Sequence, residues 1–364
     1  MKVPSFSESE LEVVGEIPAT PWRPAIAEFN YPVSPRDAIL AMYERTPIWQ
    51  PIGIESKVFT PRIFPDNVAR GFVFENRPFD AEKEGGGKDM FGVEWVYDTL
   101  NMGSMVYPGK PMLEDFEDWR DVIVFPDVDS WDWEGSAAEN NGTYLTPDTF
   151  NKWWIQTGFF ERLISFMDFE GAALTLFDED YRDDVKEIMN RFADLYIDII
   201  DHVIKYFPDI NGFYIHDDWG TSLDTFFSPE LAKETIVPAM RKVTDHIHKN
   251  GLYAELHSCG CNKKQIENYI AAGWDAWIPQ GSVNDTASYY EKYGDKLIFG
   301  LNPVPPFDPE TTSEDEQRAI ARDYADRFCK PGIPTMFDDV TGAMMLTPAF
   351  REELYKQSRI NYSS

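Results

Sequence analysis

A histidine and two cysteines stand close together in the run His257-Ser258-Cys259-Gly260-Cys261. Side chains alternate along an extended chain, so His257 and Cys259 point to the same side, where an imidazole and a thiolate can bind one metal ion. The third cysteine, Cys329, lies far along the chain and reaches them only if the loop before the next strand extends over the same face. Such a nitrogen and sulfur ligand set favours zinc, and three protein ligands leave one position open for water or substrate. The pattern predicts a catalytic zinc.

Two other interpretations stay open on spacing alone. In the first, His257 satisfies a core carbonyl and the cysteines are small buried residues. In the second, the cysteines are a redox pair, although C-x-C differs from the C-x-x-C of dithiol oxidoreductases. The run begins where the apolar segment 252–257 gives way to a loop. In a barrel, this is the end of a strand at which active sites are built.

Acidic residues follow the preceding expected strand. Asp217 and Asp218 come directly after the apolar segment 212–216, so one of them is a candidate proton donor or a partner that orients a zinc ligand. The alternative is a solvated cap of the following helix. His216 lies within that strand and is equally explained as a satisfied core histidine.

Aromatic residues make up 15% of the chain. Flat substrates are held well between aromatic walls, which favours a flat small molecule as substrate. For each aromatic residue, core packing is the alternative role. Three that lie in segments expected near the site are candidate substrate contacts: Trp95, Tyr97 and Trp219.

Helical and strand patterns alternate from about residue 175 onward, which is typical of a parallel sheet or barrel wrapped in helices. The expected helices are 180–207, 228–250, 264–272, 287–293, 313–328 and a terminal helix, and an earlier one begins at Ser34-Pro35. The expected strands are 212–216, 252–257, 275–279, 296–300 and 333–337.

This part supplies about five strand and helix units, and the N-terminal half has room for about three more, so we predict an α/β fold, a single-domain (β/α)8 TIM barrel. The rival is an open doubly wound sheet, but no G-x-G-x-x-G follows a first strand. Residues 1–33, rich in proline and acidic residues, are predicted to form a surface arm, and residues 34–364 the barrel.

Charge and composition exclude several classes of protein. Lys plus Arg number 33 and Asp plus Glu 63, which gives a net charge of −30, so we expect neither nucleic acid nor a membrane surface as a partner. No segment reaches the roughly 20 apolar residues of a membrane span, and the N-terminus lacks the pattern of a secretory signal. Three cysteines are too few for a disulfide framework, which predicts a cytoplasmic protein.

Three segments together resemble the uroporphyrinogen decarboxylase superfamily, and within it the corrinoid-dependent methyltransferases. The most specific is Tyr253-Ala254-Glu255-Leu256-His257-Ser258-Cys259-Gly260, which contains the His-x-Cys-Gly element. Upstream, Asp89-Met90-Phe91-Gly92-Val93-Glu94-Trp95 resembles a D-x-F-G-x-x-W segment, and Asp217-Asp218-Trp219-Gly220 with Ser228-Pro229-Glu230 resembles a D-D-x-G and S-P-E stretch. The likeness covers most of the chain from about residue 35.

The resemblance implies a distorted TIM barrel whose zinc assists methyl transfer to or from a corrinoid (cobalamin) carried by a partner protein. The implied ligands are His257, Cys259 and Cys329, and Cys261, outside the pattern, is a substitute for the third. The resemblance also implies a small methyl donor or acceptor, for which we favour O-demethylation of a methoxylated aromatic.

Two alternatives remain. A uroporphyrinogen decarboxylase would need an Arg-Gln-Ala-Gly-Arg segment, whereas the nearest basic element is Ala69-Arg70-Gly71-Phe72. A chain of net charge −30 is also poorly suited to a polyanionic substrate without a local cluster of arginines. The other alternative is a zinc-binding barrel without turnover.

Overall fold

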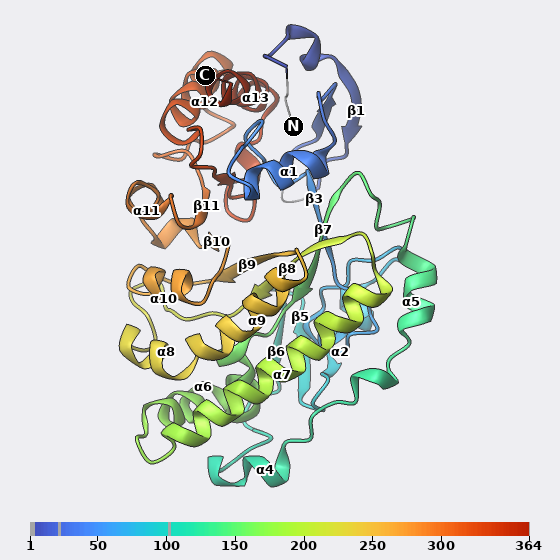
Figure 1. Ribbon diagram of the computed structural model, residues 1–364, viewed down its shortest axis with the longest axis vertical. Coiled ribbons are helices and arrows are strands. Elements are labelled where there is room, and N and C mark those ends of the chain that lie inside the picture. The colour runs from blue at the N-terminus through green and yellow to red at the C-terminus, as the bar shows by residue number, and fades with distance from the viewer. Residues whose placement is uncertain (1–3, 21–22, 101–102, 364) are drawn as a thin grey trace. The chain divides into compact units, whose positions relative to one another are not determined.

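The computed structural model describes residues 4–20, 23–100 and 103–363 (Figure 1). Their contacts divide the chain into two compact units. Unit 1 comprises the described residues up to Ser56, Asp148–Phe150, and the chain from Asp275 onward. Unit 2 comprises Lys57–Pro147 and Asn151–Trp274.

Unit 2 contains two kinds of sheet. Strands β7 (Phe150–Ile155), β8 (Ile210–His216) and β9 (Tyr253–Ser258) pair in parallel, with β3 (Ser56–Phe59) beside β7. A separate antiparallel sheet consists of β4 (Gly87–Lys88), β5 (Glu94–Asp98) and β6 (Gly103–Val106). The helices are α2 (Pro65–Arg70), α3 (Ala81–Glu84), α4 (Trp119–Val122), α5 (Trp133–Asn140), α6 (Phe159–Phe177), α7 (Arg182–Tyr206), α8 (Pro229–Thr235), α9 (Val237–Lys249) and α10 (Ile266–Ala271).

The two faces of the β7–β9 sheet differ in chemistry. The register aligns Trp154 with Tyr214, Tyr214 with Glu255, and His216 with His257, so these side chains share one face. The other face is apolar and fully buried, and its residues include Trp153, Ile155, Phe213, Ile215, Ala254 and Leu256. The long helices α7 and α9 pack side by side, and α9 contacts β9 (Figure 1). The buried face therefore supplies the core of unit 2.

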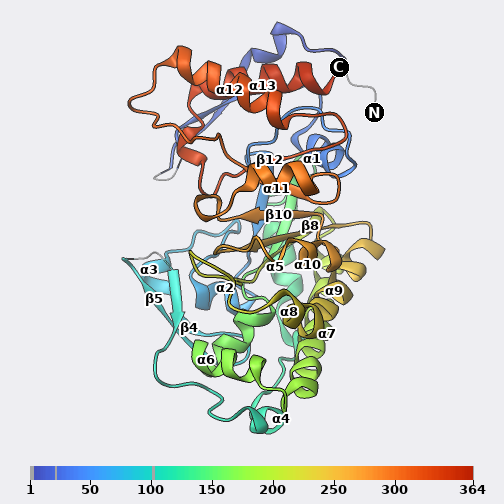
Figure 2. The same ribbon diagram turned by 90° about the vertical axis from the view of Figure 1, so that its left-hand side faces the viewer.

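Unit 1 combines a short antiparallel pair with a parallel sheet. The antiparallel pair is β1 (Val13–Ile17) and β2 (Ile26–Phe29). The parallel strands are β10 (Ala276–Pro279), β11 (Ile298–Leu301) and β12 (Met336–Phe337). The helices are α1 (Pro35–Tyr43), α11 (Thr286–Tyr293), α12 (Glu314–Phe328) and α13 (Pro348–Tyr362), of which α12 and α13 lie side by side (Figures 1 and 2).

The predicted arm packs into unit 1. Phe29 of β2 belongs to a buried apolar cluster with Trp49 and Tyr355. Glu10 is 6% exposed, and its carboxylate accepts hydrogen bonds from Tyr355 Oη at 2.7 Å and Arg359 Nε at 2.8 Å. Of the predicted arm, residues 1–3 and 21–22 lie outside the described residues. Glu10 and Phe29 contact α13, whereas Val13 and Val14 of β1 are exposed.

The alternation of parallel strands with helices confirms the predicted α/β fold. Unit 2 contributes four such sheet strands and unit 1 three, where eight were predicted. The difference lies in the segment 60–147, which forms short helices and the antiparallel β4–β6 sheet because it has no long apolar run. The predicted helix 228–250 is also two helices, since Pro238, at the start of α9, has no N–H to continue a hydrogen-bonded turn.

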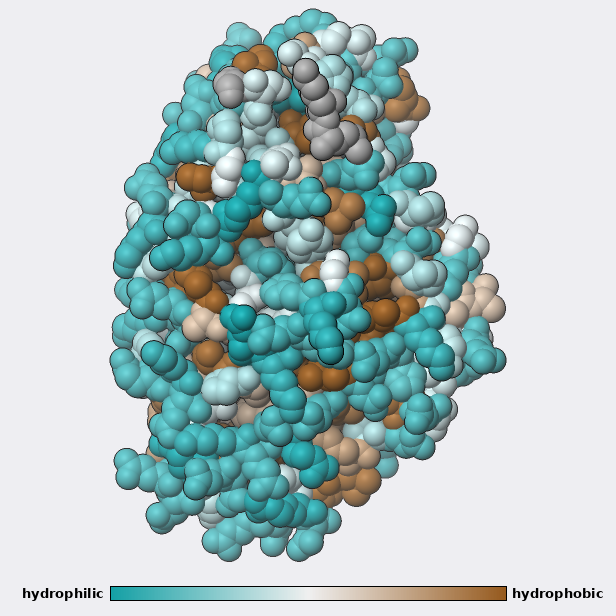
Figure 3. All heavy atoms as spheres, in the orientation of Figure 1, coloured by the Kyte–Doolittle hydropathy of each residue, from teal (hydrophilic) through white to brown (hydrophobic). Residues whose placement is uncertain are grey.

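None of the described helices is both long enough and apolar enough to cross a membrane. Hydrophilic side chains cover most of the face seen in Figure 3, in keeping with the large excess of acidic residues.

Candidate metal centre

Four potential metal ligands meet in unit 2 at the carboxyl ends of β8 and β9. They are His216, Asp218, His257 and Cys259, and one ligand atom from each lies within 4.8 Å of all the others. His257 Nε2 is 3.1 Å from Cys259 Sγ, and His216 Nε2 is 3.4 Å from Asp218 Oδ1. The imidazoles of His216 and His257 stack with ring centroids 5.0 Å apart. The cluster thus consists of the predicted pair, His257 and Cys259, together with His216 of the preceding strand and Asp218 of the loop that follows that strand.

Glu161 fixes the orientation of the His216 ring. Its Oε2 is 2.6 Å from His216 Nδ1, so Nδ1–H donates to the carboxylate and Nε2 faces the other ligands. Glu161 lies in the first turn of α6 and is also 3.6 Å from Arg70 Nη1 through its other oxygen. A carboxylate behind a metal-binding imidazole is the usual way in which proteins orient such a ligand.

The loops after β8 and β9 are joined by hydrogen bonds. The Cys259 N–H donates to Asp218 Oδ1 at 2.6 Å, and the Trp219 N–H donates to Ser258 Oγ at 3.1 Å. Gly260 has φ of +87°, and a Cβ there would lie 2.2 Å from the carbonyl oxygen of Gly220. The glycines that end the two motifs, Gly220 and Gly260, therefore allow the two loops to contact each other, which brings their ligands together.

Asp217 has a positioning role rather than a place in the cluster. Its side chain is fully buried and accepts hydrogen bonds from the Glu161 N–H at 2.9 Å, the Phe160 N–H at 3.3 Å and Trp219 Nε1 at 2.7 Å. It thereby caps the N-terminus of α6, where orphan backbone donors favour an anion. A Cβ at Gly158 would lie 2.5 Å from Asp217 Cβ, so only glycine fits before this cap.

Electrostatics at the cluster favour a cation. Burial alone would lower the pKa of His216, but the carboxylates of Glu161 and Asp218 hold that pKa well above its ordinary value. Burial also raises the pKa of the Cys259 thiol, against the lowering effect of His216. Burial and the charge of Glu161 raise the pKa of Asp217 to about 7.

The donor set fits zinc. Two imidazole nitrogens, a thiolate and a carboxylate oxygen are all common zinc ligands, and the four atoms lie close enough together to share one ion. The carboxylate behind His216 supplies the outer hydrogen bond that zinc-binding histidines usually have. On this chemistry the residues present can hold the metal that the sequence predicts.

The other two cysteines have contacts of their own. Cys261 is buried in unit 2, and its N–H donates to the Thr221 carbonyl at 2.7 Å. Cys329 belongs to unit 1, where its Sγ is 3.3 Å from Gln50 Oε1 at the end of α12. Burial raises the pKa of Cys329 to about 12. Its predicted role as a zinc ligand stays a prediction.

The predicted substrate aromatics have packing contacts. Trp219 is fully buried against Phe227 and Tyr269. Tyr97 packs where Gly71 has no side chain, since a Cβ there would lie 2.5 Å from its ring. Trp95 is 6% exposed and lies 5.0 Å from the guanidinium of Arg70, which in turn contacts Glu161.

The D-x-F-G-x-x-W segment folds around its aspartate. Asp89 accepts hydrogen bonds from the N–H groups of Phe91 and Val93 at 2.9 Å and from Trp95 Nε1 at 3.0 Å. Its carboxylate also pairs with the fully buried Arg162 at 2.8 Å. The motif therefore reflects a loop built on a buried ion pair.

Sequence reasoning missed two residues of the candidate site, His216 in the cluster and Glu161 behind it. The signal for His216 was available, because parallel pairing of the two apolar strands sets His216 beside His257. Glu161 gave no such signal, since it is brought to the site by the capping of α6 and not by any local pattern.

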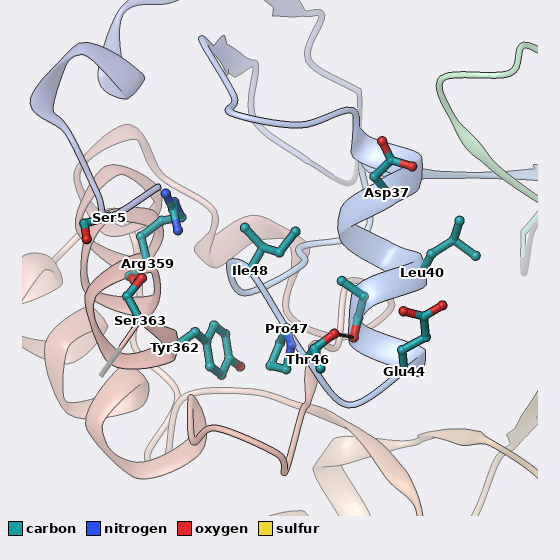
Figure 4. Close-up of a pocket in the computed structure, with 11 residues that line it drawn as sticks. Ser5, Asp37, Leu40, Glu44, Thr46, Pro47, Ile48, Arg359, Tyr362 and Ser363 are labelled. Carbon is teal, nitrogen blue, oxygen red and sulfur yellow. Dashed lines mark hydrogen bonds between the residues drawn. The ribbon is translucent and has the colours of Figure 1, made fainter. Parts of the chain in front are cut away.

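A pocket of about 530 Å³ in unit 1 lies apart from these residues in the chain (Figure 4). It is lined by residues of α1 and α13, including Asp37, Leu40, Arg359 and Tyr362. Thr46 Oγ1, also at this pocket, donates to the Ala41 carbonyl at 3.3 Å (Figure 4). No predicted site residue lines it.

Comparison with known proteins gives evidence on the fold. No protein-family model matches the sequence, and no curated protein matches it. Among solved structures, a methyltransferase from Methanosarcina mazei is similar with a TM-score of 0.60 and 12% sequence identity, over 91% of this chain and 100% of that chain. This chain therefore shares the fold of a methyltransferase.

Proposed function

We propose that this protein is a zinc-dependent methyltransferase that moves a methyl group between a small methoxylated aromatic and a corrinoid carried by a partner protein. The observation that carries the proposal is the group of His216, Asp218, His257 and Cys259, whose ligand atoms lie within 4.8 Å of one another. A fold shared with a methyltransferase supports methyl transfer as the reaction. The corrinoid and its carrier rest on the resemblance of the sequence motifs.

The chain's own residues would hold and orient the metal. His216, His257 and Cys259 would bind it, with Glu161 keeping the His216 ring in place. Bound there, zinc supplies a Lewis acid that stabilises negative charge on the donor oxygen as the methyl group leaves. Negative charge on the leaving oxygen is otherwise unfavourable in so acidic a protein. A metal at the cluster would stabilise that charge, which is the main barrier to ether cleavage.

Asp218 is the ligand best placed to give way to substrate. Four protein ligands would fill a tetrahedral zinc, whereas catalytic zinc keeps one position open. The Asp218 side chain is 29% exposed, against 13% for His216, and it already holds the Cys259 N–H. Asp218 would therefore either complete the site or leave that position to substrate, and its hydrogen bond from the Cys259 N–H would keep the loop folded.

Metal content of protein purified without chelator tests the proposal. We expect about one zinc per chain, lost in His257→Ala and Cys259→Ala and kept in the matched Cys261→Ala variant. Cys329→Ala separates the two ligand assignments: zinc is kept if Asp218 and His216 complete the site, and lost if Cys329 is a ligand. Zinc-free protein that stays folded would overturn the zinc mechanism.

Activity is then measured with methoxylated aromatics and a cob(I)alamin acceptor. Methyl transfer by the zinc-loaded protein, lost in His257→Ala, is the expected result. A zinc-loaded protein that transfers no methyl group from any of them would instead favour a zinc-binding barrel without turnover.

A further inference from the structure

The face of the β7–β9 sheet that carries the histidines also carries a charged and aromatic surface. We call Lys152, Trp154, Tyr214 and Glu255, together with the two histidines, the polar face. Barrel strands usually fill such a face with branched apolar residues. Lys152, Trp154, Tyr214 and His216 are instead partly exposed, while the opposite face is fully buried.

Aromatic rings connect this surface to the metal ligands. The ring centroids of Trp154 and Tyr214 are 5.5 Å apart, that of Trp154 is 6.4 Å from His216, and that of Tyr214 is 6.3 Å from His257. A flat molecule resting on Trp154 and Tyr214 would therefore lie directly beside the proposed zinc.

Lys152 lies at the far end of the polar face from the proposed metal ligands. Its Nζ is 2.8 Å from Glu255 Oε2 and 5.3 Å from the centroid of the Tyr214 ring. Glu255 and His257 are two residues apart on one strand face, a step of about 6.7 Å. A benzene ring with substituents at opposite ends spans a similar length, so a substrate with one substituent at the metal would place the other near Glu255, the partner of Lys152.

Two groups at this end offer hydrogen-bond donors, the Lys152 ammonium and the Trp154 indole. An ammonium group has three donors, of which Glu255 accepts one. The buried indole Nε1 of Trp154 has no acceptor among the residues that the structure describes. A ligand with an oxygen acceptor there, a carboxylate or phenolate, would satisfy these donors, and an unmet buried donor is costly.

We infer that the polar face is the substrate site, and that it selects methoxylated aromatic acids, with Trp154 and Tyr214 holding the ring and Lys152 reading an oxyanion opposite the methoxy group. The inference rests on the proposed function for the position of the methoxy oxygen. Its specificity-determining residue, Lys152, lies outside the metal ligands.

Calorimetric titration of the zinc-loaded protein with 4-methoxybenzoate and with neutral methoxybenzene tests the inference. We expect the acid to bind about tenfold or more tightly. In Lys152→Met/Glu255→Gln, which leaves no unpaired buried charge, the two ligands should bind alike, with methoxybenzene unchanged. The matched control is Lys57→Met, which removes a lysine of the neighbouring strand β3 that also lies over a tyrosine ring, that of Tyr144.

Equal binding of the two ligands by wild type, or a preference that survives in the double variant, overturns the inference. Zinc content is measured in every sample. A zinc-loaded protein without the preference refutes the inference alone, whereas a preference that depends on Lys152 in a protein that binds no zinc refutes the proposed function and leaves the binding site standing.

Discussion

The parallel strands of the two units differ in what they are made of. In unit 1, every residue of β10 and β11 is buried, and all are apolar side chains or glycine. In unit 2, β7, β8 and β9 bury one face completely and place lysine, glutamate, histidine and aromatic residues on the other. The strands of unit 1 are thus suited to packing, whereas those of unit 2 divide packing and chemistry between their faces.

This division separates stability from function within single strands. Phe213 and Tyr214 are neighbours on β8, yet one is fully buried and the other partly exposed. Substitutions on the buried face should therefore act on folding, and those on the polar face on binding. Unit 1 offers the internal control, because its strands have no polar face of this kind.

The largest effect is expected on the buried faces. Phe213→Ala in unit 2 and Phe299→Ala in unit 1 each remove a fully buried ring, which should lower the free energy of unfolding by about 3–5 kcal/mol. Urea denaturation measures the loss, and amide exchange read by segment locates it in the unit that carries the change. Similar loosening of both units by either variant would mean that the division has no energetic counterpart.

A smaller effect is expected from metal. If zinc binds the folded cluster alone, a concentration 100-fold above the dissociation constant stabilises it by about 2.7 kcal/mol. Amide exchange should slow around His216 and His257 and remain unchanged around β10 and β11. Cys259→Ala should abolish this protection, and protection centred on unit 1 would contradict the assignment of the site.

The smallest effect concerns pH and the N-terminal segment of unit 1. Burial would raise the pKa of Glu10, but hydrogen bonds from Arg359 and Tyr355 lower it below its ordinary value of 4.5. A depressed carboxylate pKa stabilises the fold above about pH 4.5 and ceases to do so as the pH falls through the folded-state value. Glu10→Gln should cost about 2 kcal/mol at pH 7 and less at pH 3, as measured by urea denaturation. A cost that does not change with pH would show that the ion pair is not its source.

Local patterns predicted the second half of the fold well. The helical patterns that predicted helices over 180–207 and 313–328 correspond to α7 and α12. The first half could not be predicted in this way, because Asp66, Asp89 and Arg162 stabilise it through buried charges that lie far apart in the sequence.

The candidate site followed the same rule. His257 and Cys259 share one strand end, so their spacing predicted them. His216 joins them through parallel pairing and Glu161 through the capping of α6, contacts that depend on tertiary structure. Trp154 and Tyr214 were missed as aromatic contacts because only the register shows which face of the sheet they occupy.

The hydrogen bonds from Arg359 and Tyr355 to Glu10 affect the order in which the protein folds during synthesis. Unit 2 is synthesised almost as one stretch and can fold as it leaves the ribosome, whereas unit 1 joins residues before Ser56 to residues after Asp275. The Glu10 carboxylate therefore stays exposed to water until α13 has been synthesised. Among the described residues, some of the earliest to be synthesised are among the last to reach their final contacts.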